Sequence, residues 1–596
     1  LSGPMMVLAG PGSGKTSVIV ERTAYMINEG GISPSNILVV TFSRAAAKEM
    51  KERFLSFTGQ QYTPVTFGTF HGVFYGILKQ AYGFTAANIL SDEEKFGILR
   101  ELTLNYGGDL AEEGDFPEEI AREISVVKGN KIALEHYYSS CCPDEVFRQI
   151  YQGYREACQS RRKLDFDDMI LYCYELFVQR KDILEAWQKK FQYILVDEFQ
   201  DINQLQYDIV RMLAKPQNNL FIVGDDDQSI YHFRGARPEI MLNFTRDYPD
   251  AETVTLDVNY RCSGQILSAA MYVIGENKKR FSKKLSTPNQ VGKAVQIREF
   301  QNPREEYLAV VSELRERMEN GERLEDTAIL LRTNQEAEGL VGALMERQVP
   351  FNMKEKLPNL FQHWICRNLL AYMHFAAGEK NRKYFLEFMN RPNRYISRDA
   401  LSLSSVVSFE ELKEFYKDKD WMCDRITTLE THLRVLKSLA PYAAINFIRK
   451  GMGYEEYLRE YAEYRKIKPE ELSEILDRLT ESTKGMNSLE EWESYIEEYT
   501  EKLEEQARKA EQEREGVLIS TLHGVKGLEY EQVYILNVNE GSMPYRKAVL
   551  EPAIEEERRL FYVGMTRARK QLALCYVRQQ YEKKREPSRF LKEAGV

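Results

Sequence analysis

The chain has 596 residues, of which 43% are hydrophobic and 29% charged, and its formal net charge is −10. This length exceeds what one hydrophobic core supports and, at about 150 residues per domain, favours around four units. No apolar run reaches the about 18 residues that a membrane-spanning helix needs. The net negative charge argues against indiscriminate binding of polyanions.

Cysteine usage points to a reducing compartment. Eight cysteines are scattered along the chain, and only Cys141 and Cys142 are adjacent. Without a Cys-x-x-Cys pair, the sequence indicates neither a zinc site nor a disulfide framework, so we expect a cytoplasmic protein with no membrane partner. No signal peptide is visible, and because Leu1 stands almost directly before the first strand, we expect residues to precede it.

Residues 9–16 form the stretch around which the chain is organised. An apolar run at 5–8 precedes it and a helical pattern at 17–26 follows it, which is the context of a phosphate-binding loop. Such a loop turns backbone N–H groups toward phosphate oxygens at a helix N-terminus. Lys15 can reach the β- and γ-phosphates, and the Thr16 hydroxyl can hold Mg²⁺. We therefore expect a nucleoside triphosphate site built from Ala9, Gly10, Pro11, Gly12, Ser13, Gly14, Lys15 and Thr16.

Strands alternate with helices after this loop, which predicts a doubly wound parallel sheet. The expected strands are residues 37–42, 65–70, 193–196, 220–223 and 254–260. Between 88 and 190 only helical patterns occur, so a helical unit is expected to interrupt the sheet domain. Its predicted helices are residues 94–104, 117–128, 143–160 and 166–180.

Acidic and aromatic residues follow two of these strands. Asp197 and Glu198 end the strand at 193–196, where Asp197 can hold Mg²⁺ and Glu198 can activate the attacking water. Gln228, after the strand at 220–223, can sense the γ-phosphate. Tyr231 and Phe233 would point the same way in extended chain, and they either sandwich bases or pack under the loop.

A second α/β unit follows. Its expected strands are residues 295–300, 328–331, 350–352, 517–521, 533–538 and 572–577. A helix over 555–569 carries several arginines, and another helical stretch, 357–515, interrupts the unit. This second unit can bring an arginine to the γ-phosphate held by the first, so hydrolysis would depend on closure of the cleft between them. The basic cluster at 278–284 fits a solvated face better than a nucleic-acid site.

Nine short motifs run from one end of the chain to the other. They are Ala-Gly-Pro-Gly-Ser-Gly-Lys-Thr (9–16), Val-Val-Thr-Phe-Ser-Arg-Ala-Ala (39–46), Gly-Thr-Phe-His (68–71), Leu-Asp-Phe-Asp-Asp-Met (164–169), Val-Asp-Glu-Phe-Gln-Asp (196–201), Gly-Asp-Asp-Asp-Gln-Ser-Ile-Tyr-His-Phe-Arg-Gly-Ala (224–236), Asn-Tyr-Arg (259–261), Thr-Leu-His-Gly-Val-Lys-Gly-Leu-Glu-Tyr (521–530) and Tyr-Val-Gly-Met-Thr-Arg-Ala-Arg (562–569). In this order and spacing the chain resembles superfamily 1 DNA helicases of the UvrD/Rep/PcrA type. Phe233 stands where that family usually has tryptophan, and the second helical insertion is shorter than usual.

The resemblance implies an α/β fold of two RecA-like motor domains, each with an inserted, mainly helical subdomain. The expected boundaries are 1–86 and 191–263 for the first motor domain, 87–190 for its insertion, 264–375 and 516–596 for the second motor domain, and 376–515 for its insertion. It also implies ATP and Mg²⁺ as cofactors and single-stranded DNA, with its junctions to duplex, as partner.

Site roles follow from the resemblance, position by position. On the nucleotide side these are Lys15 and Thr16 (phosphate and Mg²⁺), Asp197 (Mg²⁺), Glu198 (water activation), Gln228 (coupling to DNA), Tyr260 (adenine), Arg261 (γ-phosphate), Glu529 (ribose) and Arg567 (arginine finger). The matching DNA-side positions are Phe42, His71, Tyr231, Phe233, Arg234, His523 and Lys526.

The expected activity is ATP-driven 3′-to-5′ movement on single-stranded DNA by a helicase of DNA repair or replication restart. Alternatives are a translocase that strips proteins or serves a nuclease partner without unwinding alone, a nucleotide-gated DNA-binding switch, and, most remotely, an ATPase unrelated to nucleic acid. Lys15, Asp197, Glu198 and Arg567 argue against the switch, since a non-hydrolysing protein could dispense with Glu198.

Overall fold

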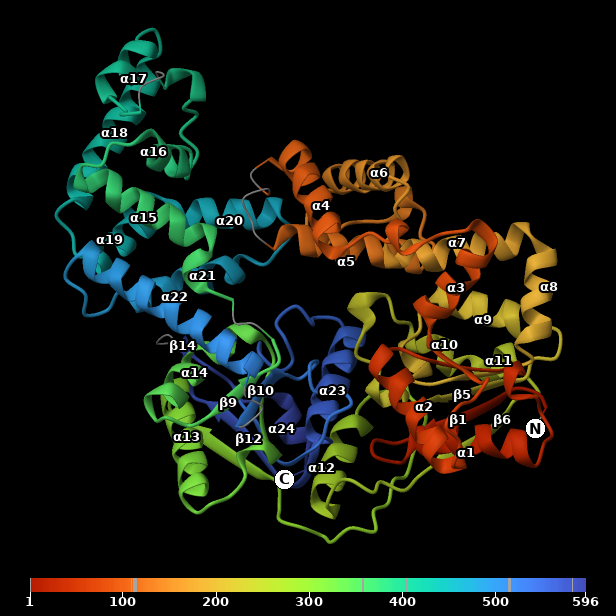
Figure 1. Cartoon of the computed structure of the whole chain (residues 1–596). Helices are drawn as coiled ribbons and strands as arrows, with labels where there is room; N and C mark the ends of the chain where they lie inside the picture. The colour runs from red at the N-terminus through yellow and green to blue at the C-terminus, as the bar shows by residue number, and fades with distance from the viewer. Residues whose placement is uncertain are drawn as a thin grey trace.

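We describe a computed structural model of the chain, which defines residues 2–108, 110, 115–355, 358–401, 405–512, 516–580 and 583–595. Two six-stranded parallel sheets, each flanked by helices, form its two motor domains, and the predicted fold class is thereby confirmed (Figure 1). Helical arms extend from both motor domains. Among the described residues, no helix is both long enough and apolar enough to cross a membrane.

The first sheet has the strand order β3-β2-β4-β5-β1-β6. Its strands are β1 (Met5–Ala9), β2 (Ile37–Thr41), β3 (Thr66–Thr69), β4 (Tyr193–Val196), β5 (Leu220–Gly224) and β6 (Glu252–Leu256). β2 and β5 are buried along their whole length, as expected for central strands covered on both faces. β6 is a largely exposed edge strand and ends at Leu256, before the predicted end.

Helices cover both faces of this sheet. α1 (Lys15–Asn28) and α2 (Arg44–Thr58) lie on one face, and α3 (Phe70–Tyr82), α9 (Gln204–Ala214) and α10 (Pro238–Leu242) on the other. Because all strands are parallel, their carboxyl ends share one edge, where the loops after β1, β4 and β5 meet. The three predicted nucleotide motifs are therefore brought together at that edge.

The first insertion contains α4 (Asp92–Tyr106), α5 (Phe116–Gly129), α6 (Asp144–Ser160), α7 (Phe166–Gln179) and α8 (Lys181–Lys190). The four predicted helices therefore exist, and α8 follows them. α7 and α8 share a hydrophobic core with the first sheet, whereas α4, α5 and α6 form the projecting arm. The expected insertion at 87–190 thus includes two helices that pack on the motor domain.

The second sheet has the order β7-β12-β11-β8-β10-β9. Its strands are β7 (Gln296–Phe300), β8 (Thr327–Leu331), β9 (Phe351–Met353), β10 (Val517–Thr521), β11 (Tyr530–Ile535) and β12 (Ala568–Val577). Its main helices are α12 (Gly264–Gly275), α13 (Pro303–Glu319), α14 (Ala337–Glu346) and α23 (Glu551–Met565). The predicted helix over 555–569 was wrong at its end: α23 stops at Met565, because Ala568 already pairs with Tyr530 in the sheet.

The second insertion forms the longer arm in Figure 1. It comprises α15 (Trp364–Ala377), α16 (Arg382–Phe388), α17 (Phe409–Phe415), α18 (Asp420–Leu436), α19 (Pro441–Asn446), α20 (Tyr454–Tyr464), α21 (Pro469–Ser482) and α22 (Leu489–Gln512). α15, expected within the motor domain, shares the insertion's core. A cleft of about 1370 Å³ separates α13 and α14 from α21 and α22, away from the predicted motifs.

The two insertions contact each other. Arg465, at the end of α20, is 2% exposed and lies 3.0 Å from the Glu119 carboxylate of α5. Its guanidinium also donates to the backbone carbonyl of Cys141, and Lys466 pairs with Asp144 at 2.6 Å. This polar contact joins the two arms above the motor domains.

Candidate functional site

The phosphate loop connects β1 to α1 as predicted. Gly12 has φ +62°, and a Cβ there would meet Arg261 Cβ at 2.8 Å, so both backbone conformation and space favour glycine. The Ser13 hydroxyl donates to the Gly10 carbonyl at 2.8 Å. Ala9 and Pro11 are buried, Gly14 caps the helix with φ +87°, and Lys15 and Thr16 open it. The loop therefore presents its amide groups at a helix N-terminus.

Lys15 and Glu198 form an ion pair. The Lys15 ammonium lies 3.2 Å from Glu198 Oε1, joining the loop after β1 to the end of β4. Burial alone would raise the pKa of Glu198, but Lys15 and Lys526 outweigh it and lower the pKa to about 2. Glu198 also has φ +49°, a strained conformation of the kind found at functional sites. Glu198 is thus ionised and held in position.

Asp197 has the surroundings of a metal ligand. It is 5% exposed; its Oδ2 accepts from the Thr41 hydroxyl at 3.4 Å, while its buried Oδ1 has no hydrogen-bond partner among the residues that the structure describes. Burial and the charge of Glu198 raise the pKa of Asp197 to about 7. An unsatisfied carboxylate oxygen beside the phosphate loop fits Mg²⁺, which takes one or two protein carboxylates and keeps waters.

A polar chain links this acidic pair to the second motor domain. Gln200, 0% exposed, donates to Glu198 Oε2 at 2.5 Å and accepts from the Asp225 amide at 2.9 Å. Gln228 donates to Asp225 Oδ2 at 2.6 Å and accepts from Arg567 Nη2 at 3.1 Å. Gln200 was not among the predicted site residues, although the Asp-Glu-Phe-Gln-Asp run contained it.

Arg567 reaches the first domain from the turn between α23 and β12. It is 1% exposed, and its guanidinium also donates to the carbonyls of Val563 at 2.9 Å and Leu528 at 3.2 Å. Burial, with the nearby charge of Arg261, lowers its pKa to about 9. A buried, poorly compensated guanidinium at a domain interface is suited to stabilising developing negative charge.

The predicted base and ribose positions lie at the same edge. The Tyr260 amide donates to the Gly12 carbonyl at 3.0 Å, and its side chain is 64% exposed, leaving the ring free for stacking. Arg261 Nε donates to Glu529 Oε2 at 2.6 Å, which joins residues of both domains. In this structure Arg261 and Glu529 therefore satisfy each other.

Four predicted DNA-side rings form a row across the two domains. Phe42, after β2, stacks on Tyr231 with centroids 6.1 Å apart and planes 7° apart. Tyr231 lies 6.0 Å from Phe233, which lies 5.3 Å from His523 of the second domain. Phe233 lies in a 3₁₀ turn, so the extended chain in which the Tyr231 and Phe233 rings would point the same way is not present. The Arg234 guanidinium lies over the Tyr231 and Phe233 rings, 5.2 and 5.4 Å from their centroids.

Lys526 bridges the two halves of the site. Its ammonium donates to the Asp201 carboxylate and, at 2.9 Å, to the Gln228 carbonyl, and it lies 4.9 Å from the centroid of the Tyr231 ring. It thus lies between the acidic residues after β4 and the aromatic row. Burial lowers the pKa of His523 to about 3, with Arg332 and Arg234 adding to the effect, so this imidazole is neutral.

His71 lies beside a ring that the sequence analysis did not single out. Phe166, the first residue of α7, is 44% exposed, and its ring centroid lies 5.6 Å from that of His71. The Leu-Asp-Phe-Asp-Asp-Met motif was the available signal, because it places an aromatic residue at a helix start next to buried aspartates.

Comparisons with known proteins identify the family of the chain. Residues 1–249 match the UvrD/REP helicase N-terminal domain, and residues 254–579 match the UvrD-like helicase C-terminal domain. The chain is 34% identical to the putative ATP-dependent DNA helicase YjcD of Bacillus subtilis, over 99% of this chain and 79% of that protein. It is 32% identical to DNA helicase II of Escherichia coli (99% and 85%) and 31% identical to the ATP-dependent DNA helicase Rep of Salmonella typhimurium (100% and 92%). The chain therefore belongs to the UvrD/Rep helicase family.

Proposed function

We propose that this protein is an ATP-dependent DNA helicase that hydrolyses ATP with Mg²⁺ between its motor domains and moves 3′ to 5′ on single-stranded DNA. The observation that carries this proposal is the hydrogen-bonded chain from Glu198 through Gln200, Asp225 and Gln228 to Arg567. It crosses the domain interface, and the Gln228 loop continues directly into the aromatic row. The names of the relatives, ATP-dependent DNA helicases, support the same assignment.

On the nucleotide side, bound ATP and Mg²⁺ would supply the phosphoryl group and its charge neutralisation, with Thr16 and Asp197 holding the metal. Lys15 must leave Glu198 to reach phosphate oxygens, which frees the Glu198 carboxylate to accept a proton from water. Arg567 contributes positive charge from the second domain. Because its other guanidinium bonds go to groups of its own domain, its position relative to the phosphate loop depends on domain closure.

On the DNA side, the row of rings offers faces for bases. Stacking on such rings is tolerant of sequence, as a protein that moves along a strand requires. The neutral His523 imidazole carries one N–H group, so it can donate one hydrogen bond to the strand but forms no ion pair with a phosphate. The Lys526 ammonium contacts both the Gln228 carbonyl and the Tyr231 ring. A movement of Gln228 in response to the bound nucleotide would therefore be passed to the DNA strand through this one side chain.

The direction of movement and a role in DNA repair or replication restart belong to this proposal, as do single-strand/duplex junctions as substrate and a repair or nuclease protein as partner. They follow the family resemblance. Site residues are proposed in the roles given above, and Gln200 and Phe166 are added as a positioning and a DNA-stacking residue.

ATP hydrolysis with and without single-stranded DNA tests the proposal. We expect strong stimulation that Glu198→Gln abolishes, because the amide cannot accept the water proton. Glu185→Gln, on the exposed face of α8, is the matched control and keeps full activity. DNA binding without stimulated hydrolysis in the wild type would instead favour a nucleotide-gated binding switch.

A further inference from the structure

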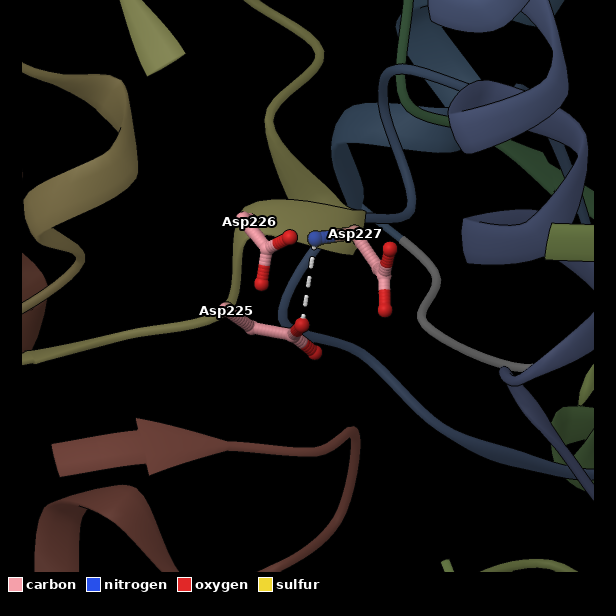
Figure 2. A group of neighbouring side chains, drawn as sticks. All are labelled: Asp225, Asp226 and Asp227. Atoms are coloured by element: carbon pink, nitrogen blue, oxygen red, sulfur yellow. Dashed lines mark hydrogen bonds between the residues drawn. The ribbon is translucent and has the colours of Figure 1, made fainter. Parts of the chain in front are cut away.

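Three consecutive buried aspartates follow β5 and surround a lysine. Asp225, Asp226 and Asp227 place one carboxylate oxygen each within 4.8 Å of one another, a geometry that could hold a cation (Figure 2). Lys283 Nζ occupies that position, at 2.6 Å from Asp225, 2.7 Å from Asp226 and 2.8 Å from Asp227. All four side chains are at most 1% exposed. We call these three aspartates, which together bind Lys283, the lysine socket.

Arg280 and the backbone of Phe281 complete the socket. Arg280 donates through Nε and Nη2 to the two oxygens of Asp227, both at 2.7 Å. The Phe281 amide donates to Asp226 Oδ2 at 2.8 Å. Burial would lower the pKa of Lys283, but the three aspartates outweigh it and raise the pKa above its ordinary value. Both cations stay charged, and the short segment 280–283 is held tightly against the β5 loop.

The socket binds a segment that begins on the other motor domain. α12, which precedes it, packs on α23 and β12 of the second sheet. Asn277 then donates to the Glu555 carbonyl at 3.0 Å, and Arg559 donates to the Lys279 carbonyl at 2.9 Å. Within a few residues the chain passes from α23 to the first domain, so segment 277–283 is a tether across the domain interface.

Asp225 serves the lysine and Gln228 together. Its Oδ1 accepts from Lys283 and its Oδ2 from Gln228, whose own amide oxygen meets Arg567. If the ammonium were removed, three buried carboxylates would face one guanidinium, and their mutual repulsion would move the Asp225 side chain. The bond between Gln228 and Arg567 would lose its support.

We propose that Lys283, assisted by Arg280, is a positioning residue that holds the loop from Asp225 to Arg234 where Gln228 meets Arg567, and thereby couples DNA binding to ATP hydrolysis. The expected effect on ATP hydrolysis rests on the proposed function. Arg280 and Lys283 thereby take a role inside the motor, whereas the other three lysines of the cluster at 278–284 are exposed, as expected from sequence.

The test compares Lys283→Met with Lys284→Met, the same substitution at the adjacent, exposed lysine. For Lys283→Met we expect the DNA-stimulated kcat to fall by about tenfold or more, while the KM for ATP changes by less than about twofold. Lys284→Met should match the wild type in both. If Lys283 were needed only for folding, Lys283→Met would lower the fraction of active protein and leave the ratio of the DNA-stimulated to the basal rate of ATP hydrolysis unchanged.

Two further measurements keep the inference falsifiable. If Lys283→Met does not fold, Arg280→Gln, which keeps the lysine, should still lower the stimulated kcat severalfold. Hydrogen exchange of the amides of residues 225–234 gives a readout independent of catalysis: we expect faster exchange in Lys283→Met, or in Arg280→Gln if that variant replaces it, than in Lys284→Met. Unchanged exchange overturns the inference whatever the ATPase shows, whereas a wild type without DNA stimulation overturns the proposed function alone.

Discussion

Replacing Arg567 by lysine tests the part that the second motor domain takes in hydrolysis. The guanidinium makes four hydrogen bonds, to Val563, Leu528, Thr566 and Gln228, from three nitrogens in a rigid plane. A lysine ammonium keeps the charge but has one nitrogen and cannot span these acceptors. Losing two charge-assisted bonds at about 1.5–2 kcal/mol each removes about 3–4 kcal/mol of the energy that holds the cation in place for the transition state. This loss corresponds to a fall of about 10²–10³-fold in kcat.

The assay is steady-state ATP hydrolysis at saturating single-stranded DNA. Arg567→Lys should lower kcat by about 10²–10³-fold with less than about threefold change in the KM for ATP, since the phosphate loop is untouched. Arg578→Lys, an exposed arginine paired with Glu299, is the matched control and should behave as wild type. A kcat within about threefold of wild type would refute the role assigned to Arg567.

Three further outcomes follow from the site and from the second domain. Tyr231→Ala removes the ring between Phe42 and Phe233 and should weaken single-stranded DNA binding by about 1–3 kcal/mol, with ATP affinity measured as the unaffected control. Asp197→Asn should raise the Mg²⁺ concentration for half-maximal hydrolysis by about tenfold or more, and an unchanged Mg²⁺ titration would remove Asp197 from the metal site. Burial raises the pKa of Glu306 to about 8, above its unfolded value of about 4.3, so its contribution to stability is fully present below about pH 4 and is lost as pH rises through about 8. The stability of Glu306→Gln relative to wild type should therefore increase as the pH rises from about 5 to about 8.5, by up to about 4 kcal/mol of unfolding free energy. Thermal unfolding of both proteins across this pH range measures it, and a stability difference that does not depend on pH would contradict this prediction.

Local motifs allowed much of the arrangement at this sheet edge to be predicted. The phosphate loop, Asp197 and Glu198 each lie at the carboxyl end of a strand that the sequence marks by a buried apolar run, so the parallel sheet brings them to one edge. Gln228 and Arg567 were also predicted, but their mutual hydrogen bond joins residues 339 positions apart and depends on the packing of the two domains.

Other features needed tertiary structure. Lys283 and Arg280 were expected on a solvated face, because a run of basic residues usually is one and their aspartate partners lie 53 to 58 positions away. α15 is apolar enough for either domain, and only its packing against α16 and α18 places it in the second insertion. The close stacking of Phe42 on Tyr231 likewise depends on how the loops after β2 and β5 meet.

Movement along single-stranded DNA is the property that defines a 3′-to-5′ translocase, and it can be measured directly. A dye placed at either end of strands of increasing length reports the arrival of the protein after ATP is mixed in. For a 3′-to-5′ translocase we expect a signal at the 5′ end whose delay grows with strand length and that is lost in Glu198→Gln. ATP hydrolysis stimulated by DNA, with a delay that does not depend on length at either end, would contradict it.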